Sequence, residues 1–250
     1  MTDPRPVCLW SGPRNVSTAL MYSFRELPGV TVVDEPLYGH YLELTGADHP
    51  GREAVIAAMN CDGNDVMHRL LERQRQNSSE RLFLKHMAHH LVEIDTSFLK
   101  ETVNVFLIRA PKEMLPSLTI QVPHAGLADT GLKRQCELHD ELVGYGQTPP
   151  VIDSRELLLD PAGVLAELCG RIDVEYSDTM LEWAPGPREE DGVWASHWYH
   201  AVHRSTGFAP YRPKTEFPER LDALLEECAP WYARLCERAI RADGGNSETA

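Results

Sequence analysis

The sequence predicts an α/β protein with three layers, in which helices cover both faces of a central parallel sheet. Short apolar runs of strand length alternate with segments of helical periodicity along most of the 250 residues. Five runs are strand candidates: residues 6–11, 30–34, 81–86, 103–109 and 149–153. Because strands that alternate with helices pair in parallel, their carboxyl ends should share one edge of the sheet, where such proteins bind ligands.

Helices are expected between and after these strands. The first should begin near Val16, and two more should lie between residues 51 and 76, separated at residues 62–64. Pro111 is well placed in the first turn of a helix that runs to Gln121. Further helices are predicted over 129–145, about 160–172 and about 218–241, and residues 184–217 should form a long ordered loop. We expect a single domain over residues 1–250, with about 242–250 as a flexible tail.

Composition narrows the classes of function. A formal net charge of −14 argues against nucleic acid or an anionic membrane as a partner, although a few basic residues can still form a local nucleotide pocket. No apolar run reaches the roughly 20 residues that span a bilayer, and no signal peptide is apparent. The six cysteines form no C-x-x-C pair, which favours reduced thiols and a cytoplasmic location. The oligomeric state stays open, a homodimer included.

The stretch at residues 6–24 has the pattern of a strand, a tight loop and a helix. The loop and the start of the helix contain Gly12, Pro13, Arg14, Asn15, Ser17 and Thr18. Free backbone N–H groups and the positive end of the helix dipole would converge here, together with the guanidinium of Arg14 and two hydroxyls. That combination suits a phosphate or a sulfate. The ATP-binding pattern G-x-x-x-x-G-K-[ST] is absent, because Ser17 and Thr18 stand at its Gly and Lys positions.

The pattern Pro-Arg-x-x-Ser-Thr at residues 13–18 resembles the 5′-phosphosulfate loop of sulfotransferases that use 3′-phosphoadenosine 5′-phosphosulfate (PAPS). A second segment resembles the 3′-phosphate motif of that family, an Arg at a strand end followed eight residues later by a Ser, here Arg109 and Ser117. The strand, acidic turn and helix over residues 151–172 also resemble the family's scaffold. The resemblances cover about residues 6–180.

This resemblance implies a P-loop NTPase-like sulfotransferase fold of the bacterial small-molecule type. The expected reaction moves the sulfuryl group of PAPS to a hydroxyl, or less readily an amine, of a small molecule and leaves 3′,5′-adenosine bisphosphate. Arg14 would stabilise the leaving 5′-phosphate and the transferring group, while Arg109 and Ser117 would hold the 3′-phosphate. Arg204 and Gly207 resemble a late basic-glycine loop that reaches the 3′-phosphate and adenine, or belong to a plain turn. No metal is expected, because arginines and backbone donors supply the positive field.

Two residues compete for the role of general base, which takes the acceptor's proton. Glu35 follows the second strand, where many bacterial members of the family have a catalytic Glu. His86 follows Lys85 at the third strand, where the cytosolic branch has Lys-x-His, and Lys85 would be a second cation. Trp194 and residues 197–200 either form the wall of an acceptor pocket or pack under the long loop. A kinase that uses ATP and Mg, and a nucleotide-binding protein without transferase activity, remain as alternatives.

Overall fold

The computed structural model of the chain describes residues 4–242. Six strands form one sheet in the order β2-β3-β1-β4-β5-β6, and each pair of neighbours is parallel. The strands are β1 (Val7–Ser11), β2 (Val30–Asp34), β3 (Arg81–Met87), β4 (Val103–Ile108), β5 (Val151–Asp153) and β6 (Ala239–Ile240). The five predicted strands are confirmed, and β6 is an addition.

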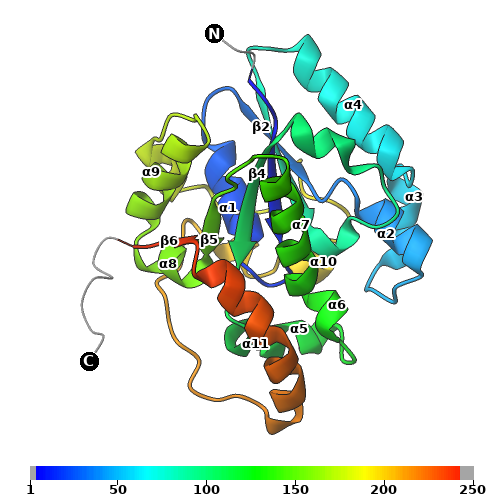
Figure 1. Cartoon of the computed structure of the whole chain (residues 1–250), viewed down its shortest axis with the longest axis vertical. Coiled ribbons are helices and arrows are strands. Elements are labelled where there is room, and N and C mark those ends of the chain that lie inside the picture. Colours follow the sequence, from blue (N-terminus) through cyan, green and yellow to red (C-terminus); the bar gives the residue numbers. More distant parts are fainter. Residues whose placement is uncertain (1–3, 243–250) are drawn as a thin grey trace.

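Helices cover both faces of the sheet, which confirms the three-layer α/β/α fold (Figure 1). The helices are α1 (Ser17–Arg25), α2 (Tyr38–Thr45), α3 (Arg52–Ala58), α4 (Gly63–Gln76), α5 (Pro111–Gln121), α6 (Leu127–Thr130), α7 (Leu132–Gly144), α8 (Ser154–Leu159), α9 (Pro161–Arg171), α10 (Ala195–Trp198) and α11 (Asp222–Cys236). Short 3₁₀ turns are η1 (Ala88–His90), η2 (Thr96–Lys100), η3 (Asp178–Leu181), η4 (Val202–Arg204) and η5 (Glu219–Leu221).

The two faces of the sheet bury different residues of each strand. Helices α1 and α9 pack on one face, against residues that include Leu9 of β1 and Leu107 of β4. Helices α4, α7 and α11 pack on the other face, against Trp10 and Phe106. Because both faces are buried, the strands are continuous apolar runs in the sequence, without a polar side that alternates with an apolar one.

The helix predictions differ from the structure in places that have local causes. The helix predicted over 129–145 is divided into α6 and α7 at Gly131, whose φ is 72°. The last helix ends at Cys236 and not near residue 241, because β6 pairs in parallel with β5. Helices α2 and α8, which have eight and six residues, were not predicted.

The C-terminal part of the described chain is fixed against the body of the protein. Ala242 was assigned to a flexible tail, but it is buried and its N–H donates to Glu156 Oε2 at 3.0 Å. The rest of that predicted tail, 243–250, lies outside the described residues. Within residues 4–242, no helix is long and apolar enough to cross a membrane.

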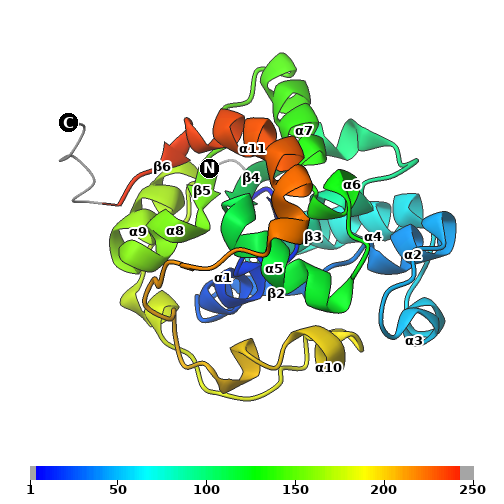
Figure 2. The ribbon, with the colours of Figure 1, turned by 90° about the horizontal axis from the view of Figure 1, so that it is seen from below.

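A long segment passes across the edge of the sheet at which the strands end. Figure 2 looks at this edge and shows the chain around α10 running past it. We call residues 184–209 the covering segment. Its only regular elements are α10 and η4, which agrees with the long ordered loop predicted there. The covering segment therefore closes one side of the space beyond the strand ends.

Candidate active site

The loop between β1 and α1 has a strained backbone that its surroundings hold in place. Arg14 and Val16 both adopt φ of 59°, a left-handed conformation that costs a non-glycine residue about 1–2 kcal/mol. Between them, Asn15 Nδ2 donates to the carbonyl of Leu107 at 3.1 Å, and Ser154 Oγ donates to the carbonyl of Asn15 at 2.9 Å. These two contacts tie the loop to β4 and α8, so its shape is set before any ligand binds.

Gly12 has a packing role at the start of this loop. A Cβ on Gly12 would lie 2.4 Å from the carbonyl oxygen of Thr130, so only glycine fits against α6. Gly12 itself is not among the residues that line the pocket described next. We therefore assign Gly12 to the placement of the loop, and not to direct contact with a ligand.

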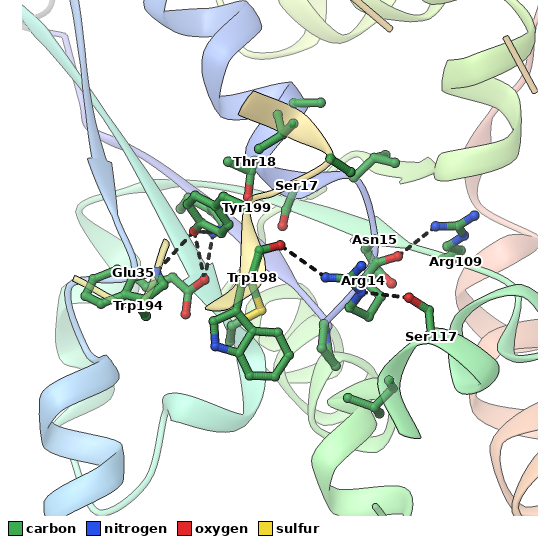
Figure 3. A pocket seen from close by; sticks show the side chains of 18 of the residues that line it. Arg14, Asn15, Ser17, Thr18, Glu35, Arg109, Ser117, Trp194, Trp198 and Tyr199 are labelled. Carbon is green, nitrogen blue, oxygen red and sulfur yellow. Dashed lines mark hydrogen bonds and ion pairs between the residues drawn. The ribbon is translucent and has the colours of Figure 1, made fainter. Parts of the chain in front are cut away.

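A pocket of about 320 Å³ opens at the carboxyl edge of the sheet, between this loop, β3, α5 and the covering segment (Figure 3). Small-molecule sites in proteins have volumes from about 300 to 1,000 Å³. Eight of the residues predicted to bind the donor line the pocket: Pro13, Arg14, Asn15, Ser17, Thr18, Arg109, Ser117 and Gly207. Thus the structure brings together two motifs that are about a hundred residues apart in the sequence.

Two arginines meet at one end of the pocket (Figure 3). Arg109 Nη1 donates to the carbonyl oxygen of Arg14 at 2.8 Å, and Arg14 Nε donates to Ser117 Oγ at 2.8 Å. Burial, followed by repulsion from Arg109, lowers the pKa of Arg14, which remains charged at neutral pH. The Glu113 carboxylate, which lies 3.4 Å from Arg109 Nε, offsets one of these two positive charges. Two arginines against one carboxylate leave this end of the pocket positive, in a protein that is acidic as a whole.

Lys214 is a further cation near this end that the sequence did not reveal. Its Nζ donates to the backbone carbonyl of Glu113 at 2.8 Å, which brings it beside α5. Burial, and then repulsion from Arg109, lowers the pKa of Lys214. No local pattern marks this residue, since its position depends on a contact between segments 101 residues apart.

The segment that contains Arg204 and Gly207 agrees only in part with the prediction. Gly207 lines the pocket and pairs with Glu182 in an isolated bridge, and a Cβ there would lie 2.7 Å from the carbonyl oxygen of Leu181. Arg204, in contrast, is exposed and is not among the lining residues, so the structure gives no support to a donor-binding role for Arg204. Arg204 is the last residue of the turn η4, and the residue that follows it, Ser205, lines the pocket.

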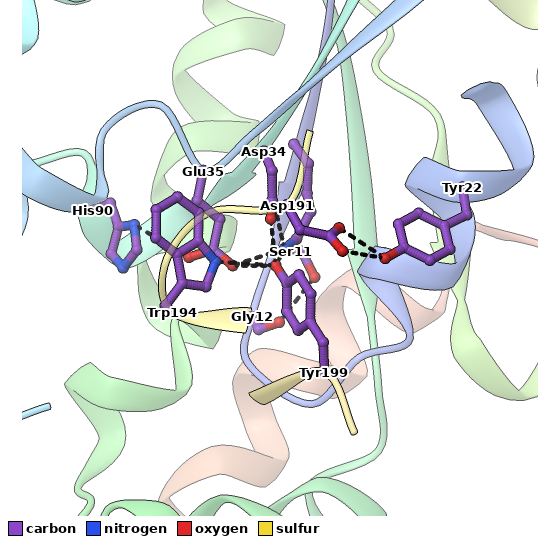
Figure 4. Close-up of polar contacts among 10 residues, drawn as sticks. Ser11, Gly12, Tyr22, Asp34, Glu35, His90, Asp191, Trp194 and Tyr199 are labelled. Atoms are coloured by element: carbon purple, nitrogen blue, oxygen red, sulfur yellow. Dashed lines mark hydrogen bonds and ion pairs between the residues drawn. The ribbon is translucent and has the colours of Figure 1, made fainter. Parts of the chain in front are cut away.

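Lys85 lies on the opposite side of the pocket, at the centre of a buried polar network. Its Nζ donates to Asp34 Oδ1, Glu35 Oε1 and the hydroxyl of Tyr199, each at 2.7 Å. Tyr199 in turn donates to Asp34 Oδ2 at 2.6 Å, and Trp194 Nε1 donates to Tyr199 at 3.2 Å (Figure 4). The network joins β2 and β3 to the covering segment.

Two carboxylates face one ammonium group in this network, which gives it a net negative charge. Burial raises the pKa of Asp34 to about 6, and Lys85 only partly offsets this effect. Burial acts against the charge of Lys85, but Asp34 and Glu35 together outweigh it and raise the pKa of the lysine. Lys85 is therefore held as an ammonium ion, which orients the carboxylate of Glu35 through Oε1.

Glu35 is the carboxylate of this network that reaches the pocket. It follows the last residue of β2 and adopts φ of 42°, a left-handed conformation that turns the chain away from the strand. Its Oε1 is bound by Lys85, while its Oε2 lies 4.0 Å from His90 Nδ1. Glu35 is thus fixed at one oxygen and has the other available to a molecule in the pocket.

His86, the other candidate for the base, is not at the pocket. It lies inside β3 opposite Trp10, and because side chains alternate along a strand it points away from the face that carries Lys85. Its ring stacks on Trp10 with centroids 4.4 Å apart, and within residues 4–242 neither ring nitrogen has a hydrogen-bond partner. Burial lowers the pKa of His86 to about 3. The catalytic role predicted for His86 is therefore wrong, and Glu35 is the candidate that the structure retains.

We expect His86→Phe to fold, to retain wild-type turnover and to be less sensitive to acid. A neutral buried histidine destabilises the fold as pH falls from 6.5, where the unfolded state takes up a proton, towards about 3. The slope is about 1.4 kcal/mol per pH unit for each such proton. Urea unfolding would be measured at pH 7 and pH 4.5. The free energy of unfolding should fall less between these two pH values for His86→Phe than for wild type. An unchanged loss, or a loss of turnover in the folded variant, would contradict this assignment.

The aromatic and histidine residues at the Glu35 end of the pocket were only partly recognised. Trp194, Trp198 and Tyr199 line the pocket, and Trp194 and Tyr199 also belong to a buried hydrophobic cluster. These residues therefore both line a pocket and pack under the long loop, the two alternatives that the sequence left open. His89 and His90 line the pocket from η1, whereas the sequence suggested for them, with His86, only a metal site without a third ligand. Within the described part of the chain, no group of three or more His, Cys, Asp or Glu side chains is arranged to hold a metal ion.

The covering segment is fastened to α1 by one buried carboxylate. The hydroxyl of Tyr22 lies 2.7 and 2.8 Å from the two oxygens of Asp191 (Figure 4). His203 Nε2 lies 2.8 Å from Asp191 Oδ2, and the backbone N–H of Arg188 donates to the same oxygen at 2.8 Å. These contacts hold both halves of the covering segment and so keep Trp194 and Tyr199 at the pocket.

The fold places this chain among the α/β proteins with a parallel sheet, and its pocket lies at the carboxyl ends of the strands, where such proteins bind their ligands. The comparison with known families is more specific. A profile described as a sulfotransferase domain matches residues 6–239. The chain belongs to this sulfotransferase domain family.

Three solved structures share this fold over most of their length. The sulfotransferase domain of the olefin synthase of Synechococcus PCC 7002 has a TM-score of 0.54 and 18% identity, with 92% of this chain and 96% of that chain covered. The sulfotransferase domain from the curacin biosynthetic pathway has a TM-score of 0.52 and 14% identity, covering 90% and 98%. A sulfotransferase from Alicyclobacillus acidocaldarius has values of 0.51 and 12%, covering 94% and 97%. At these identities the likeness shows the fold alone.

Two curated proteins of Arabidopsis thaliana are more similar in sequence. Branched-chain-amino-acid aminotransferase-like protein 1 is 37% identical over 234 residues, which are 93% of this chain and 42% of that protein. Branched-chain-amino-acid aminotransferase-like protein 2 is 35% identical over 225 residues, which are 89% of this chain and 40% of that protein. The chain thus spans about two fifths of the length of these relatives.

Proposed function

We propose that this protein transfers the sulfuryl group of PAPS to a hydroxyl group of a small molecule. The observation that carries the proposal is the division of one pocket into two ends of opposite charge (Figure 3). Arg14, Arg109 and Ser117 lie at one end, whereas Glu35 lies at the other. Sulfuryl transfer needs both: cations for an anionic donor, and a base for the proton of the acceptor.

The residues at the positive end fit a donor that carries two phosphate groups. The N-terminus of α1, with Ser17 and Thr18, presents backbone N–H groups and hydroxyls that suit the 5′-phosphosulfate. Arg109 offers a planar fork to the 3′-phosphate, Ser117 adds a hydroxyl, and Lys214 adds a second cation nearby. PAPS supplies the sulfuryl group and a leaving group, 3′,5′-adenosine bisphosphate.

The proton and charge balance can be assigned to residues of this chain. As the acceptor oxygen forms its bond to sulfur, and the bond from sulfur to the 5′-phosphate oxygen breaks, Glu35 Oε2 takes the acceptor's proton. Arg14 and the N–H groups of the loop stabilise the negative charge that develops on the leaving phosphate. Lys85 keeps Glu35 in place through Oε1 during this step.

We do not extend aminotransferase chemistry to this chain, although the two Arabidopsis relatives carry that name. Such chemistry needs a lysine whose amine is free to form a Schiff base. Lys85 lines the pocket, but it is buried between two carboxylates and its pKa is raised, so it is held as an ammonium ion.

Calorimetric titration with 3′,5′-adenosine bisphosphate, adenosine 5′-phosphate and ATP with Mg tests the proposal. Wild type should prefer the bisphosphate, and a chelator should not weaken its binding. Arg109→Ala should lower the affinity for the bisphosphate about 30- to 100-fold, because it removes a charge-assisted contact to the 3′-phosphate. The affinity for adenosine 5′-phosphate should fall much less, because for this ligand the variant loses only the hydrogen bond from Arg109 that holds the carbonyl of Arg14.

A matched control is Arg234→Ala, which removes an exposed arginine that pairs with Asp140 and does not line the pocket. This variant should bind all three nucleotides as wild type does. Equal losses for the bisphosphate and the monophosphate in Arg109→Ala would contradict the 3′-phosphate assignment. A preference of wild type for ATP with Mg would overturn the proposal in favour of a kinase.

A further inference from the structure

The acceptor end of the pocket has its own chemical character. We define the acceptor end as the lining residues on the Glu35 side, which are Glu35, Tyr38, His49, His89, His90, Asp129, Trp194 and Trp198. Figure 3 shows Glu35 and Trp194 on the side away from Arg109 and Ser117, with Trp198 between them. Any acceptor that reaches the donor must be held among these side chains.

The two carboxylates at this end have few ion pairs within the described chain: Glu35 pairs with Lys85, and Asp129 forms none. Arg14 reaches this end only through the backbone carbonyl of Trp198, to which its Nη1 donates at 3.3 Å. Lys85 is already shared by Asp34 and Glu35, so these three groups together remain negative. Asp129 adds a second lining carboxylate, whose Oδ2 accepts the backbone N–H of Gly126 at 2.8 Å.

The three histidines at the acceptor end are neutral at physiological pH. Burial lowers the pKa of His89 to about 3 and places the pKa of His90 well below its usual value. Burial also lowers the pKa of His49, although Asp129 and Glu35 act in the opposite direction. The histidines therefore do not offset the two acids.

His90 also indicates that a polar ligand belongs here. Its ring lies between Tyr38 and Tyr41, with centroid distances of 4.8 and 4.6 Å, and the residue is 1% exposed. Within residues 4–242 its Nδ1 has no hydrogen-bond partner, and Glu35 Oε2 lies 4.0 Å away. Buried polar atoms are normally hydrogen-bonded, so a hydroxyl that bridges His90 and Glu35 would satisfy both.

Aromatic rings enclose the remaining sides of the acceptor end. Tyr38 packs edge-to-face against Trp194 at 5.3 Å, and its hydroxyl lies 3.0 Å from His49 Nδ1. Trp198 stands edge-on to His49 at 6.2 Å. Aromatic faces beside carboxylates attract organic cations through the ring quadrupole, whereas they give no favourable site to an anion.

We infer that the acceptor is an amino alcohol or amino phenol, with its ammonium group among Asp129 and the aromatic rings and its hydroxyl at Glu35. This inference rests on the proposed function. The sulfate ester forms at the hydroxyl: the acceptor oxygen bonds to sulfur, the bond from sulfur to the 5′-phosphate breaks, and Glu35 receives the proton. The ammonium group keeps its protons and takes no part in the bond changes.

Probes of similar shape that carry a positive, a zero or a negative charge test this inference. Transfer of radiolabelled sulfate from PAPS would be measured with tyramine, 4-ethylphenol and 4-hydroxyphenylacetate, and with choline against 3,3-dimethylbutan-1-ol. We expect kcat/KM to be about tenfold higher for each cation than for its neutral counterpart, and lowest for the anion. Binding of the same probes to the protein loaded with 3′,5′-adenosine bisphosphate should follow the same order.

Asp129→Asn should remove most of the preference for cations while the affinity for 3′,5′-adenosine bisphosphate stays unchanged. The amide can still accept the N–H of Gly126, so the fold of α6 is retained. The matched control is Asp160→Asn at the start of α9, where the carboxylate accepts the N–H of Gly163 at 2.9 Å and does not line the pocket. That variant loses the same charge and should keep the preference.

The outcomes separate this inference from the proposed function. Binding of the bisphosphate with equal or better use of the neutral or anionic probes overturns the cationic acceptor and leaves the sulfotransferase proposal intact. The same holds if the loaded protein neither binds nor modifies tyramine or choline. Failure to bind the bisphosphate at all overturns the proposed function itself. Equal effects of Asp129→Asn and Asp160→Asn on the preference would also contradict the inference.

Discussion

Glu35→Gln is expected to lower kcat by about 10²- to 10⁴-fold, the usual contribution of a general base. The amide oxygen can still accept the hydrogen bond of Lys85, and the side chain keeps its size, so the buried network should stay assembled. What the variant loses is the oxygen that takes the acceptor's proton. The rate of transfer from PAPS would be measured beside the affinity for 3′,5′-adenosine bisphosphate, which should not change.

The matched control for this variant is Glu137→Gln on the exposed face of α7, where the carboxylate lies 3.8 Å from Lys133. It should retain wild-type turnover. If Glu35→Gln keeps a rate close to wild type, the base must be sought elsewhere at the acceptor end. If it loses the bisphosphate as well, the change has damaged the pocket and the role of the base is not supported.

Lys85→Met is expected to destabilise the fold by about 3–5 kcal/mol, because two buried carboxylates lose their only shared cation within the described chain. In wild type the pKa of Lys85 is raised, so its contribution is fully present below about pH 10.5. That contribution is lost only as pH rises through the still higher value of the folded state. Urea unfolding at pH 7 and pH 11 would measure both effects.

A double variant gives the control for this prediction. Removing one of the two charges in Asp34→Asn/Lys85→Met should restore part of the stability, since fewer buried charges then lack a partner. Tyr199 can still donate to the amide oxygen that replaces Asp34 Oδ2. A loss below about 1 kcal/mol in the single variant would show that the network contributes little to folding.

Features encoded by neighbouring residues could be predicted from the sequence. The strand, loop and helix around Arg14 lie within one short stretch, and Arg109 and Ser117 are related by a strand end and two helical turns. Parallel pairing then brings these segments to the same edge. The fold class, the positive end of the pocket and the position of Glu35 therefore followed from local patterns.

Other features depended on information that the sequence does not display. Whether Lys85 or His86 reaches the pocket depends on which face of β3 each occupies, and a strand buried on both faces has no polar alternation to reveal it. Tyr199 reaches the pocket, and Lys214 reaches α5 beside it, by contacts over about a hundred residues. Strand β6 has two residues, too few for any pattern.

The covering segment has a consequence for how new specificities can arise in this fold. It supplies Trp194 and Trp198 to the acceptor end, and Ser205 and Gly207 border the same pocket a few residues later. An insertion or deletion that remodelled the acceptor wall would shift the chain that also borders the donor, and it would pull on the anchor at Asp191. Divergence towards other acceptors should therefore proceed by exchange of single side chains, with the length of this segment held constant.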